Sequence, residues 1–287
     1  PPCRNGQDNS GHGSRQFLPA GYSRGKAGMC RYQIIRSGTN VRAGGQVTTY
    51  TNDLGQVVGF PIPDWTPPEG PAREVLVGRV CRAEPLRIED HAEALYQAFT
   101  VEGADAGWSY LPYGPFDTRD AFDDWIRATC LSDNPLFFAF VDVATGKAVG
   151  LASYLNINRA YGTIEVGHVH FAPVMQRSRI ASEAMYLMMR HAFDAGYRRY
   201  EWKCNMLNAP SRAAAQRFGF SYEGIFRQHM VVRGENRDSA WYACIDGEWP
   251  ALKRAFETWL DDANFDADGR QVQSLSNLTR PILVATD

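Results

Sequence analysis

The sequence predicts an α/β fold in which a mixed, mostly antiparallel central sheet is flanked by helices. One observation is that segments with strand-like alternation and segments with helical spacing follow one another along the chain. A second is that residues 136–157 hold two strand patterns joined by a turn at Gly146, which indicates a hairpin. A third is that the next strand pattern, 163–171, runs through Pro173 into a helical pattern. Strands paired first by hairpins and then through a helix give such a sheet.

The composition is that of an ordinary soluble globular protein. The chain has 287 residues, 44% of them hydrophobic, and a net charge of -2. This near-neutral balance argues against nucleic-acid or membrane partners. The six cysteines form no CxxC pair, and no apolar run approaches the ~20 residues of a membrane span. We therefore expect a cytoplasmic protein with reduced thiols, and the sequence leaves open whether it is a homodimer.

The domain boundaries follow from changes in composition. Residues 1–46 are rich in Gly, Ser, Arg and Asn, so we expect a disordered leader, and whether it belongs to the native protein stays open. Residues 47–77 include the run FPIPDWTPPEGP and are expected to form an extended strap. The folded domain is expected over 78–262. The tail, 263–287, is polar without clear periodicity and is expected to be irregular.

The first elements of the domain follow in quick order. Residues 79–86 favour a strand, and residues 88–99 repeat apolar side chains at helical spacing. A loop rich in aromatic residues, 108–116, follows and can be either core packing or a lid over a pocket. Thr118 suits the N-cap of a second helix, whose apolar face begins at Phe122.

The second half of the domain alternates helices with strands. A helix is expected from Ser178 to Ala195, with Gly196 as its C-terminal stop, and a strand over 197–205 follows. Asn208 is expected to begin a short helix that ends at Gly219. The remaining expected elements are strands over 220–232 and 239–245 and a last amphipathic helix that ends near Leu260.

The stretch after the strand 163–171 has the features of an anion-binding turn. A helix begins there among Gln176, Arg177, Ser178 and Arg179. Free backbone N–H groups, the positive end of the helix dipole and two arginines would together attract a pyrophosphate. The same residues also suit a helix start that is only capped and binds nothing, so both interpretations stay open here.

Two segments carry a resemblance to a known family. The order of the elements, with FAPVMQRSRIASEA (171–184) and NAPSRAAAQRFGF (208–220), resembles the GNAT superfamily of acetyl-CoA-dependent N-acetyltransferases over roughly residues 79–260. Within the family it is most similar to the RimJ/RimL-like branch of ribosomal-protein-alanine acetyltransferases. The resemblance implies acetyl-CoA as acyl donor, an amine as acceptor and no metal. It also implies a splayed strand that binds the pantetheine arm, at Val169, His170 and Phe171.

The family motif Q/R-x-x-G-x-G/A implies which residues bind the cofactor phosphates. Its positions hold Gln176, Arg177, Ser178, Arg179, Ile180 and Ala181. Arg179 stands where the family has its central glycine, which normally lets the backbone approach the phosphates. Its side chain can either point outward or pair with a phosphate.

The second motif supplies two further site residues. The resemblance implies that Asn208 contacts the pantetheine arm and that Ser211 lies near the sulfur. Many family members have a tyrosine four residues before the glycine of the GF pair, but Ala215 occupies that position here. Ser211 or solvent must therefore protonate the departing thiolate. Without the resemblance, Asn208 and Ser211 also fit a helix N-cap and its partner.

The strand 163–171 holds the remaining candidate residues. Glu165 is a candidate general base that takes the proton of the amine through water, although a strand carboxylate can also be merely half-exposed. His168 and His170 alternate on the strand and are expected on one face, with Glu165 on the opposite face. The pair could hold a metal, but no third ligand follows, so we expect two histidines that line a cleft or pack under a helix.

We predict an acetyl-CoA-dependent N-acetyltransferase that moves the acetyl group directly to a primary amine. The acceptor is a small molecule or a protein N-terminus, and the sequence does not distinguish them. The alternative is a catalytically weak CoA-binding regulatory protein on the same fold, which the absence of the family's glycine and tyrosine also permits.

Overall fold

The structure is a computed structural model that describes residues 49–287. The chain divides into two compact units, and the described part of the first is residues 49–61. These residues form an antiparallel hairpin of β1 (Thr49–Thr51) and β2 (Val57–Gly59). Residues 62–287 belong to the second unit, which holds all the other described elements.

The second unit contains a large sheet, helices and short turns. Its strands are β3 (Leu76–Val77), β4 (Cys81–Pro85), β5 (Leu136–Asp142), β6 (Ala148–Asn158), β7 (Thr163–Phe171), β8 (Arg199–Asn205), β9 (Ser221–Val232) and β10 (Glu235–Ile245). Its α-helices are α1 (Ile88–Phe99), α2 (Arg119–Trp125), α3 (Arg179–Asp194), α4 (Ala209–Arg217), α5 (Trp249–Leu260) and α6 (Leu275–Thr279). Its short helical turns are η1 (Ala104–Trp108), η2 (Ile126–Cys130), η3 (Asp262–Asn264) and η4 (Arg280–Ile282).

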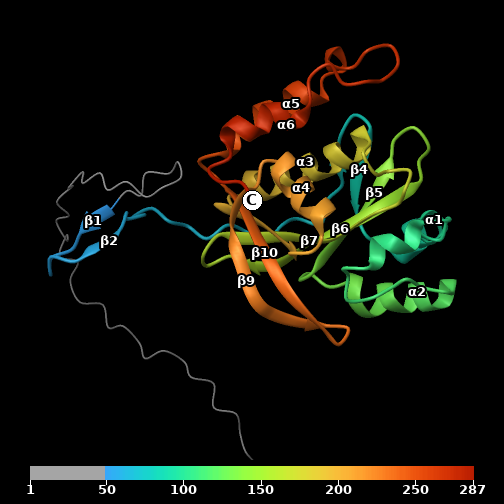
Figure 1. Ribbon diagram of the computed structural model, residues 1–287, viewed down its shortest axis with the longest axis horizontal. Coiled ribbons are helices and arrows are strands. Elements are labelled where there is room, and N and C mark those ends of the chain that lie inside the picture. Colours follow the sequence, from blue (N-terminus) through green and yellow to red (C-terminus); the bar gives the residue numbers. More distant parts are fainter. Residues whose placement is uncertain (1–48) are drawn as a thin grey trace, which may run out of the picture. The chain divides into compact units, whose positions relative to one another are not determined.

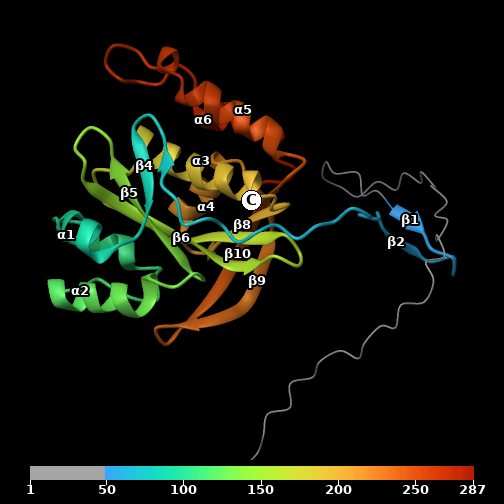
Figure 2. The same cartoon turned by 180° about the vertical axis from the view of Figure 1, so that it is seen from behind.

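The sheet has eight strands in the order β3-β4-β5-β6-β7-β8-β10-β9 (Figures 1 and 2). Neighbouring strands are antiparallel except β7 and β8, which run parallel and are connected through α3. A parallel pair needs such a crossover, whereas the antiparallel pairs β3–β4, β5–β6, β6–β7 and β9–β10 are joined by short turns. The predicted fold class, a mixed and mostly antiparallel sheet flanked by helices, is confirmed.

Helices bury an apolar core on each face of the sheet. Helices α3 and α5 pack on one face, where Met188 and Phe256 join a cluster with Phe138 of β5. Helices α1 and α2 pack on the other face, where Leu95 and Phe122 join a separate cluster. That cluster includes Phe137 of β5, the neighbour of Phe138, because successive strand residues point to opposite faces. In Figure 1, α1 and α2 lie together on one side and α3 and α4 on the other. The helix faces predicted from apolar spacing are thus the buried ones.

The sequence also predicted several helix ends correctly. Thr118 caps α2 by accepting the backbone N–H of Ala121 at 3.2 Å, and Asn208 caps α4. Gly196 follows the end of α3 with φ +92°, a left-handed conformation that glycine adopts without strain. Among residues 49–287, no helix is long and apolar enough to cross a membrane.

Two expectations about irregular segments differ from the structure. Part of the strap expected over 47–77 is the hairpin of β1 and β2. The tail expected to be irregular over 263–287 contains α6, whose Leu275 and Thr279 are fully buried. Its apolar residues are too few to show a helical period, and they are buried by packing on α4 and α5 rather than by their own pattern. The expectation for residues 1–46 lies outside the described residues.

Candidate functional site

The sheet opens between β7 and β8. The parallel ladder runs from Thr163 opposite Arg199 only as far as Val166 opposite Trp202. Beyond it, residues 167–171 of β7 pair with β6 alone, and residues 203–205 of β8 pair with β10 alone. Backbone groups on the facing edges are therefore without a strand partner in the described sheet. An extended ligand could bind there as an added strand.

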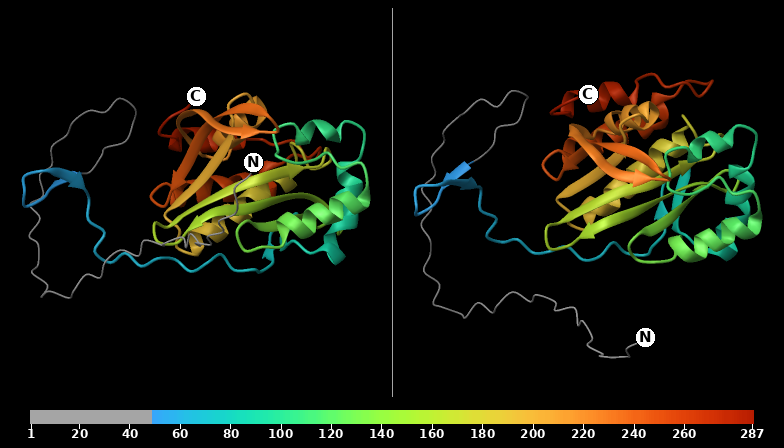
Figure 3. Two further views of the ribbon diagram at one scale, coloured as in Figure 1. Left: turned by 90° about the horizontal axis from the view of Figure 1, so that it is seen from below. Right: turned by 60° about the horizontal axis from the view of Figure 1, so that its bottom comes forward.

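A cavity of about 590 Å³ lies at this opening. Its wall includes parts of the loop after α1, of β6, β7 and β8, of the start of α4, and of the β9–β10 hairpin. Figure 3 shows the tip of that hairpin next to the loop after α1, and both line the cavity. The volume is in the range of small-molecule sites. Among the lining residues are Glu165, Val169, Lys203, Asn208, Ser211 and Arg237.

Asn208 and Ser211 enter the cavity wall from the first turn of α4. Asn208 Oδ1 accepts the backbone N–H of Ser211 at 3.1 Å, which is the N-cap contact. Ser211 Oγ accepts Nε1–H of Trp202 at 3.1 Å. A hydroxyl that accepts this bond still has its own proton to donate. Ala215, at the position of the family's tyrosine, is fully buried and offers no such proton.

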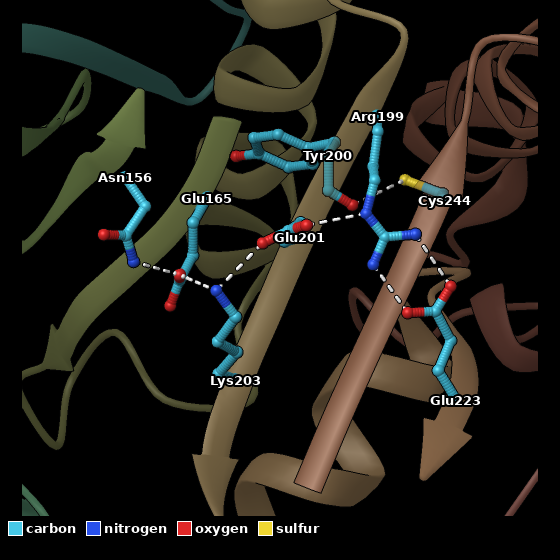
Figure 4. Close-up of polar contacts among 8 residues, drawn as sticks. All are labelled: Asn156, Glu165, Arg199, Tyr200, Glu201, Lys203, Glu223 and Cys244. Carbon is cyan, nitrogen blue, oxygen red and sulfur yellow. Dashed lines mark hydrogen bonds and ion pairs between the residues drawn. The ribbon is translucent and has the colours of Figure 1, made fainter. Parts of the chain in front are cut away.

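Glu165 enters the cavity from β7 and is held by two donors (Figure 4). Nδ2 of Asn156 donates to its Oε2 at 2.7 Å, and Nζ of Lys203 does so at 2.6 Å. Oε1 has no hydrogen-bond partner among the described residues. The Glu165 side chain is only 6% exposed, and these two hydrogen bonds satisfy its Oε2 inside the fold.

The ion pair between Glu165 and Lys203 is part of a larger network of charged side chains on β7, β8 and β9. Nζ of Lys203 also lies 2.9 Å from Glu201, whose other oxygen accepts Nε of Arg199 at 2.6 Å. Arg199 in turn binds Glu223 of β9 through two contacts, as Figure 4 shows. Burial would raise the pKa of Glu201, but hydrogen bonds from Arg199 and Lys203 outweigh it and lower that pKa. Lys203 thus shares its charge between two carboxylates.

The structure corrects the predicted face of Glu165. Glu165 was expected opposite His168 and His170, but all three lie on the side of the sheet away from α3. His168 has φ +53°, and the β6–β7 register shifts beside it, between Leu151 and Ser153. An extra residue in one strand reverses the alternation of the residues that follow. Before this bulge even-numbered residues face α3, and after it odd-numbered residues do.

The two histidines are uncharged parts of the packing at neutral pH. His170 is 3% exposed, with its ring stacked on Trp108 at a centroid distance of 3.8 Å. His168 lines the cavity, and its Nδ1 lies 3.0 Å from Ser153 Oγ. Burial lowers the pKa of each to about 4, and for His168 the charge of Arg237 adds to this effect. Among residues 49–287, no three His, Cys, Asp or Glu residues are grouped so as to hold a metal.

The predicted anion-binding turn lies at the start of α3, outside the cavity wall. Ser178 is the N-cap of α3, since its Oγ accepts the backbone N–H of Ala181 at 3.3 Å. Gln176 Nε2 donates to the carbonyl of Phe171, the last residue of β7, at 3.0 Å. Arg177 is exposed with φ +58° and takes part in no ion pair in the described structure. Arg177 is therefore the cation of this turn that is available to a ligand.

Arg179 is directed away from the turn. Its Nη2 lies 2.8 Å from Asp262 and donates to the carbonyl of Leu260 at 3.0 Å. Its guanidinium lies 4.0 Å from the centre of the Phe265 ring. Of the two orientations expected for Arg179, the structure has the one that points outward, so its side chain does not serve as a phosphate ligand here. Ile180 and Ala181 follow it as the next residues of α3.

Several residues of the cavity were not predicted from the sequence. Lys203, Arg237 and Trp241 line it from β8 and β10, and Tyr110 lines it from the aromatic loop. The loop 108–116 combines both expected roles, because Trp108 is 1% exposed in the core, while Tyr110 lines the cavity and donates to the carbonyl of Leu207 at 3.2 Å. A signal for Lys203 was available, since residues 199, 201 and 203 alternate with apolar residues on β8.

Val169, His170 and Phe171, the predicted pantetheine strand, form the part of β7 beyond its ladder with β8. Val169 lines the cavity. Trp202 and Ser211 line the cavity from the face that carries α4, whereas Glu165 and Lys203 line it from the other face. The cavity therefore passes between β7 and β8 and has walls on both faces of the sheet.

Comparisons with known proteins agree with this geometry. The profile of the acetyltransferase (GNAT) family matches residues 93–220. A GCN5-related N-acetyltransferase from Brucella melitensis is 45% identical, with 76% of this chain and 100% of that chain covered and a TM-score of 0.75. A probable GNAT-family acetyltransferase from Chromobacterium violaceum is 38% identical, with 68% and 97% covered and a TM-score of 0.64. A comparison with curated proteins gave no match.

The RimJ/RimL branch is represented among the similar structures only at a distance. RimL, a ribosomal α-N-protein acetyltransferase, is 22% identical, with 60% of this chain and 94% of that chain covered and a TM-score of 0.49. The predicted membership of that branch therefore stays a prediction.

Proposed function

The chain belongs to the GNAT family of acetyltransferases, and we propose that it transfers an acetyl group from acetyl-CoA directly to a primary amine. The family and the 45% identical relative make it an acyltransferase. The observation that carries the finer proposal is the cavity that joins the two faces of the sheet at the opening between β7 and β8. A thioester can reach it from the α4 face and an amine from the other.

The residues present fit acetyl-CoA as the acyl donor. Residues 167–171 of β7 offer backbone groups without a partner on β8, which suits the amides of the pantetheine arm. The start of α3 offers its dipole and Arg177, which is exposed and has no ion pair within residues 49–287, and both suit the pyrophosphate. When bound, acetyl-CoA supplies an activated acetyl group on a thiol leaving group. Asn208 and Ser211 lie in the wall near the same opening and would line the arm at its reactive end.

Glu165 is the proposed general base. An ammonium has no lone pair, so the acceptor must lose a proton before its nitrogen attacks the thioester carbon. Oε1 of Glu165 has no partner in the described structure, while both donors contact Oε2. Glu165 can therefore take the proton directly or through one water.

Ser211 is the proposed donor to the leaving group. As the carbon–nitrogen bond forms, the carbon–sulfur bond breaks, and the thiolate needs a proton. Trp202 donates to Ser211 Oγ, so Ser211 keeps its own hydroxyl proton to donate, either to the neighbouring Cys204 thiol or to the sulfur of CoA. Backbone N–H groups near Val169 would stabilise the oxyanion that develops on the thioester oxygen. The acetyl group thus passes to the amine without a covalent enzyme intermediate.

The four cysteines among the described residues are buried and free. Burial raises the pKa of all four thiols, so they remain protonated. These reduced thiols support the proposed cytoplasmic location.

The test combines binding with turnover. Acetyl-CoA at ~100 times its dissociation constant should stabilise the fold by about 2.7 kcal/mol and raise the melting temperature by several degrees. A panel of amines should then release CoA thiol and form the acetylated product. Stabilisation without product from any amine would favour the CoA-binding regulatory protein. No stabilisation and no heat of binding would contradict the cofactor proposal itself.

A further inference from the structure

The face of the cavity that carries Glu165 also contains a cation that forms no ion pair with any residue of the described part of the chain. Arg237 of β10 lines the cavity, and its side chain forms no ion pair or hydrogen bond among residues 49–287. Burial lowers the pKa of Arg237, which shows that the fold does not compensate its charge fully. Lys203 lies in the same wall but contacts two carboxylates. A half-buried guanidinium without a partner is costly, and an anionic ligand would remove that cost.

A second unpartnered donor lies in the same wall. Nε of Arg237 and Nε1 of Trp241 are both buried, and neither has a hydrogen-bond partner in the described structure. Both residues belong to β10 and line the cavity. Buried donors are rarely left unpaired in folded proteins. Two N–H donors, one of them on a cation, are suited to the two oxygens of a carboxylate.

The same cavity offers one acceptor group for a cation. Oε1 of Glu165 has no partner in the described structure, and the charges of Glu165 and Arg237 are close enough to affect each other. Together the free carboxylate oxygen and the free guanidinium complement a molecule with an ammonium at one end and a carboxylate at the other. Leu111, Pro112 and Met230 line the same cavity and supply apolar surface to it.

We propose that the acceptor is a free amino acid, whose carboxylate binds Arg237 and Nε1 of Trp241 while its amine lies at Glu165. This inference rests on the proposed acetyl transfer and names the substrate class for it. The ammonium gives one proton to Glu165, and its nitrogen then bonds to the acetyl carbon as the carbon–sulfur bond breaks. The thiolate that leaves takes the hydroxyl proton of Ser211, and the second proton of the nitrogen restores that hydroxyl. The products are an N-acetylamino acid and CoA. A protein N-terminus has an amide in place of the nearby carboxylate and would leave Arg237 unpaired.

Matched acceptors test this directly. We would measure kcat/KM at saturating acetyl-CoA for each of the common amino acids, its carboxamide and the amine that lacks the carboxylate, for example phenylalanine, phenylalaninamide and phenethylamine. The free amino acid of at least one such set should be preferred roughly tenfold to a hundredfold, as for one charge-assisted contact. The same order should hold for binding to the complex with CoA, measured by calorimetry.

Three variants assign the preference to its residues. The preference is the kcat/KM of the free amino acid divided by that of the amine without the carboxylate. Arg237→Met should bring this ratio close to one, and Arg237→Lys should keep part of the preference. Trp241→Phe removes one N–H while it keeps a ring and should lower the ratio partially. Arg233→Met is the charge-matched control, because Arg233 is exposed in the hairpin turn outside the cavity wall, and it should leave the ratio unchanged.

The outcomes separate this inference from the proposed function. Two results would contradict the amino acid as acceptor while leaving acetyl transfer intact. One is equal kcat/KM for amines and amino acids. The other is an unchanged ratio of the two kcat/KM values in Arg237→Met. Acetyl-CoA binding together with no binding or acetylation of any amino acid would contradict the amino acid as acceptor as well. A loss of acetyl-CoA affinity in Arg237→Met would show that Arg237 serves the cofactor instead. Only the absence of acetyl-CoA binding would contradict the proposed function itself.

Discussion

Ser211 has both a structural and a chemical contact, and the two can be separated by mutation. Its backbone N–H belongs to the helix cap of α4, while its Oγ accepts a bond from Trp202 and lines the cavity. Changing the side chain removes the hydroxyl but leaves the backbone N–H that caps the helix. The effect of such a change on turnover therefore reports the chemistry of the hydroxyl.

Ser211→Ala should lower turnover roughly tenfold to a thousandfold, as expected for loss of one acid–base or charge-stabilising group. Acetyl-CoA affinity should change little. Steady-state kinetics and calorimetry measure both quantities. Trp202→Phe is the control, because it removes the bond to Ser211 but keeps the hydroxyl. If it lowers turnover as strongly as Ser211→Ala, then Ser211 acts by positioning Trp202 rather than by donating a proton.

Glu165→Gln should lower the rate near neutral pH and recover part of it at high pH, where the amine loses its proton unaided. The change keeps the shape of the side chain and leaves Lys203 paired with Glu201. The pH–rate profile is the measurement, with the melting temperature as a check on folding. Glu201→Gln is the matched control, since Glu201 also contacts Lys203 but does not line the cavity. Parallel profiles for wild type and Glu165→Gln would exclude Glu165 as the base.

At the scale of elements, most strands and helices could be predicted, because each has its own apolar period. The strand expected over 163–171 is β7, and the strands expected over 220–232 and 239–245 are β9 and β10 to within a few residues. The bulge at His168 could not be predicted, because it depends on pairing with β6. The outward orientation of Arg179 also depends on a distant partner, Asp262. Arg237 was missed because what marks it is the absence of a partner among the described residues, and only the structure reveals this.

The two arginines at the start of α3 should have different roles, Arg177 in acetyl-CoA binding and Arg179 in stability. Arg177→Asn should weaken acetyl-CoA binding about tenfold, since it removes one charge-assisted contact, and asparagine tolerates the left-handed backbone at φ +58°. Arg179→Gln should lower the melting temperature slightly through loss of its contacts with the Leu260 carbonyl and the Phe265 ring and change affinity less than about twofold. Calorimetry at two salt concentrations measures this. The reverse order of effects would place Arg179 at the phosphates.

At the scale of the whole molecule, the two buried histidines make stability depend on pH. Burial lowers the pKa of His170 from 6.5 to about 4, so between these values the unfolded chain binds the proton more readily. The stability that this neutral histidine contributes is therefore complete above about pH 6.5 and is lost as the pH falls toward about 4. His168 acts in the same direction.

Denaturant unfolding between pH 7 and pH 5 should show this as a free energy of unfolding that decreases by about 1–2 kcal/mol per histidine. His170→Phe should keep the ring packing on Trp108 and show a smaller slope with pH, whatever its absolute stability. Tyr113→Phe, which removes a buried hydroxyl of the same cluster but no titrating histidine, should keep the slope of the wild type. An equal slope in His170→Phe would show that other groups cause the acid sensitivity.

The short ladder between β7 and β8 also has a dynamic consequence. Four residue pairs are all that join β3 to β7 on one side with β8 to β10 on the other within the sheet. Such a joint should open more often than the long antiparallel ladders, so its amides should exchange with deuterium faster than those in the middle of β6. A pantetheine arm bound along this edge would slow that exchange on both strands. The bound cofactor would then stabilise the junction between the two parts of the sheet as well as serve as a substrate. The exchange pattern with and without it would show how far along the edge it reaches.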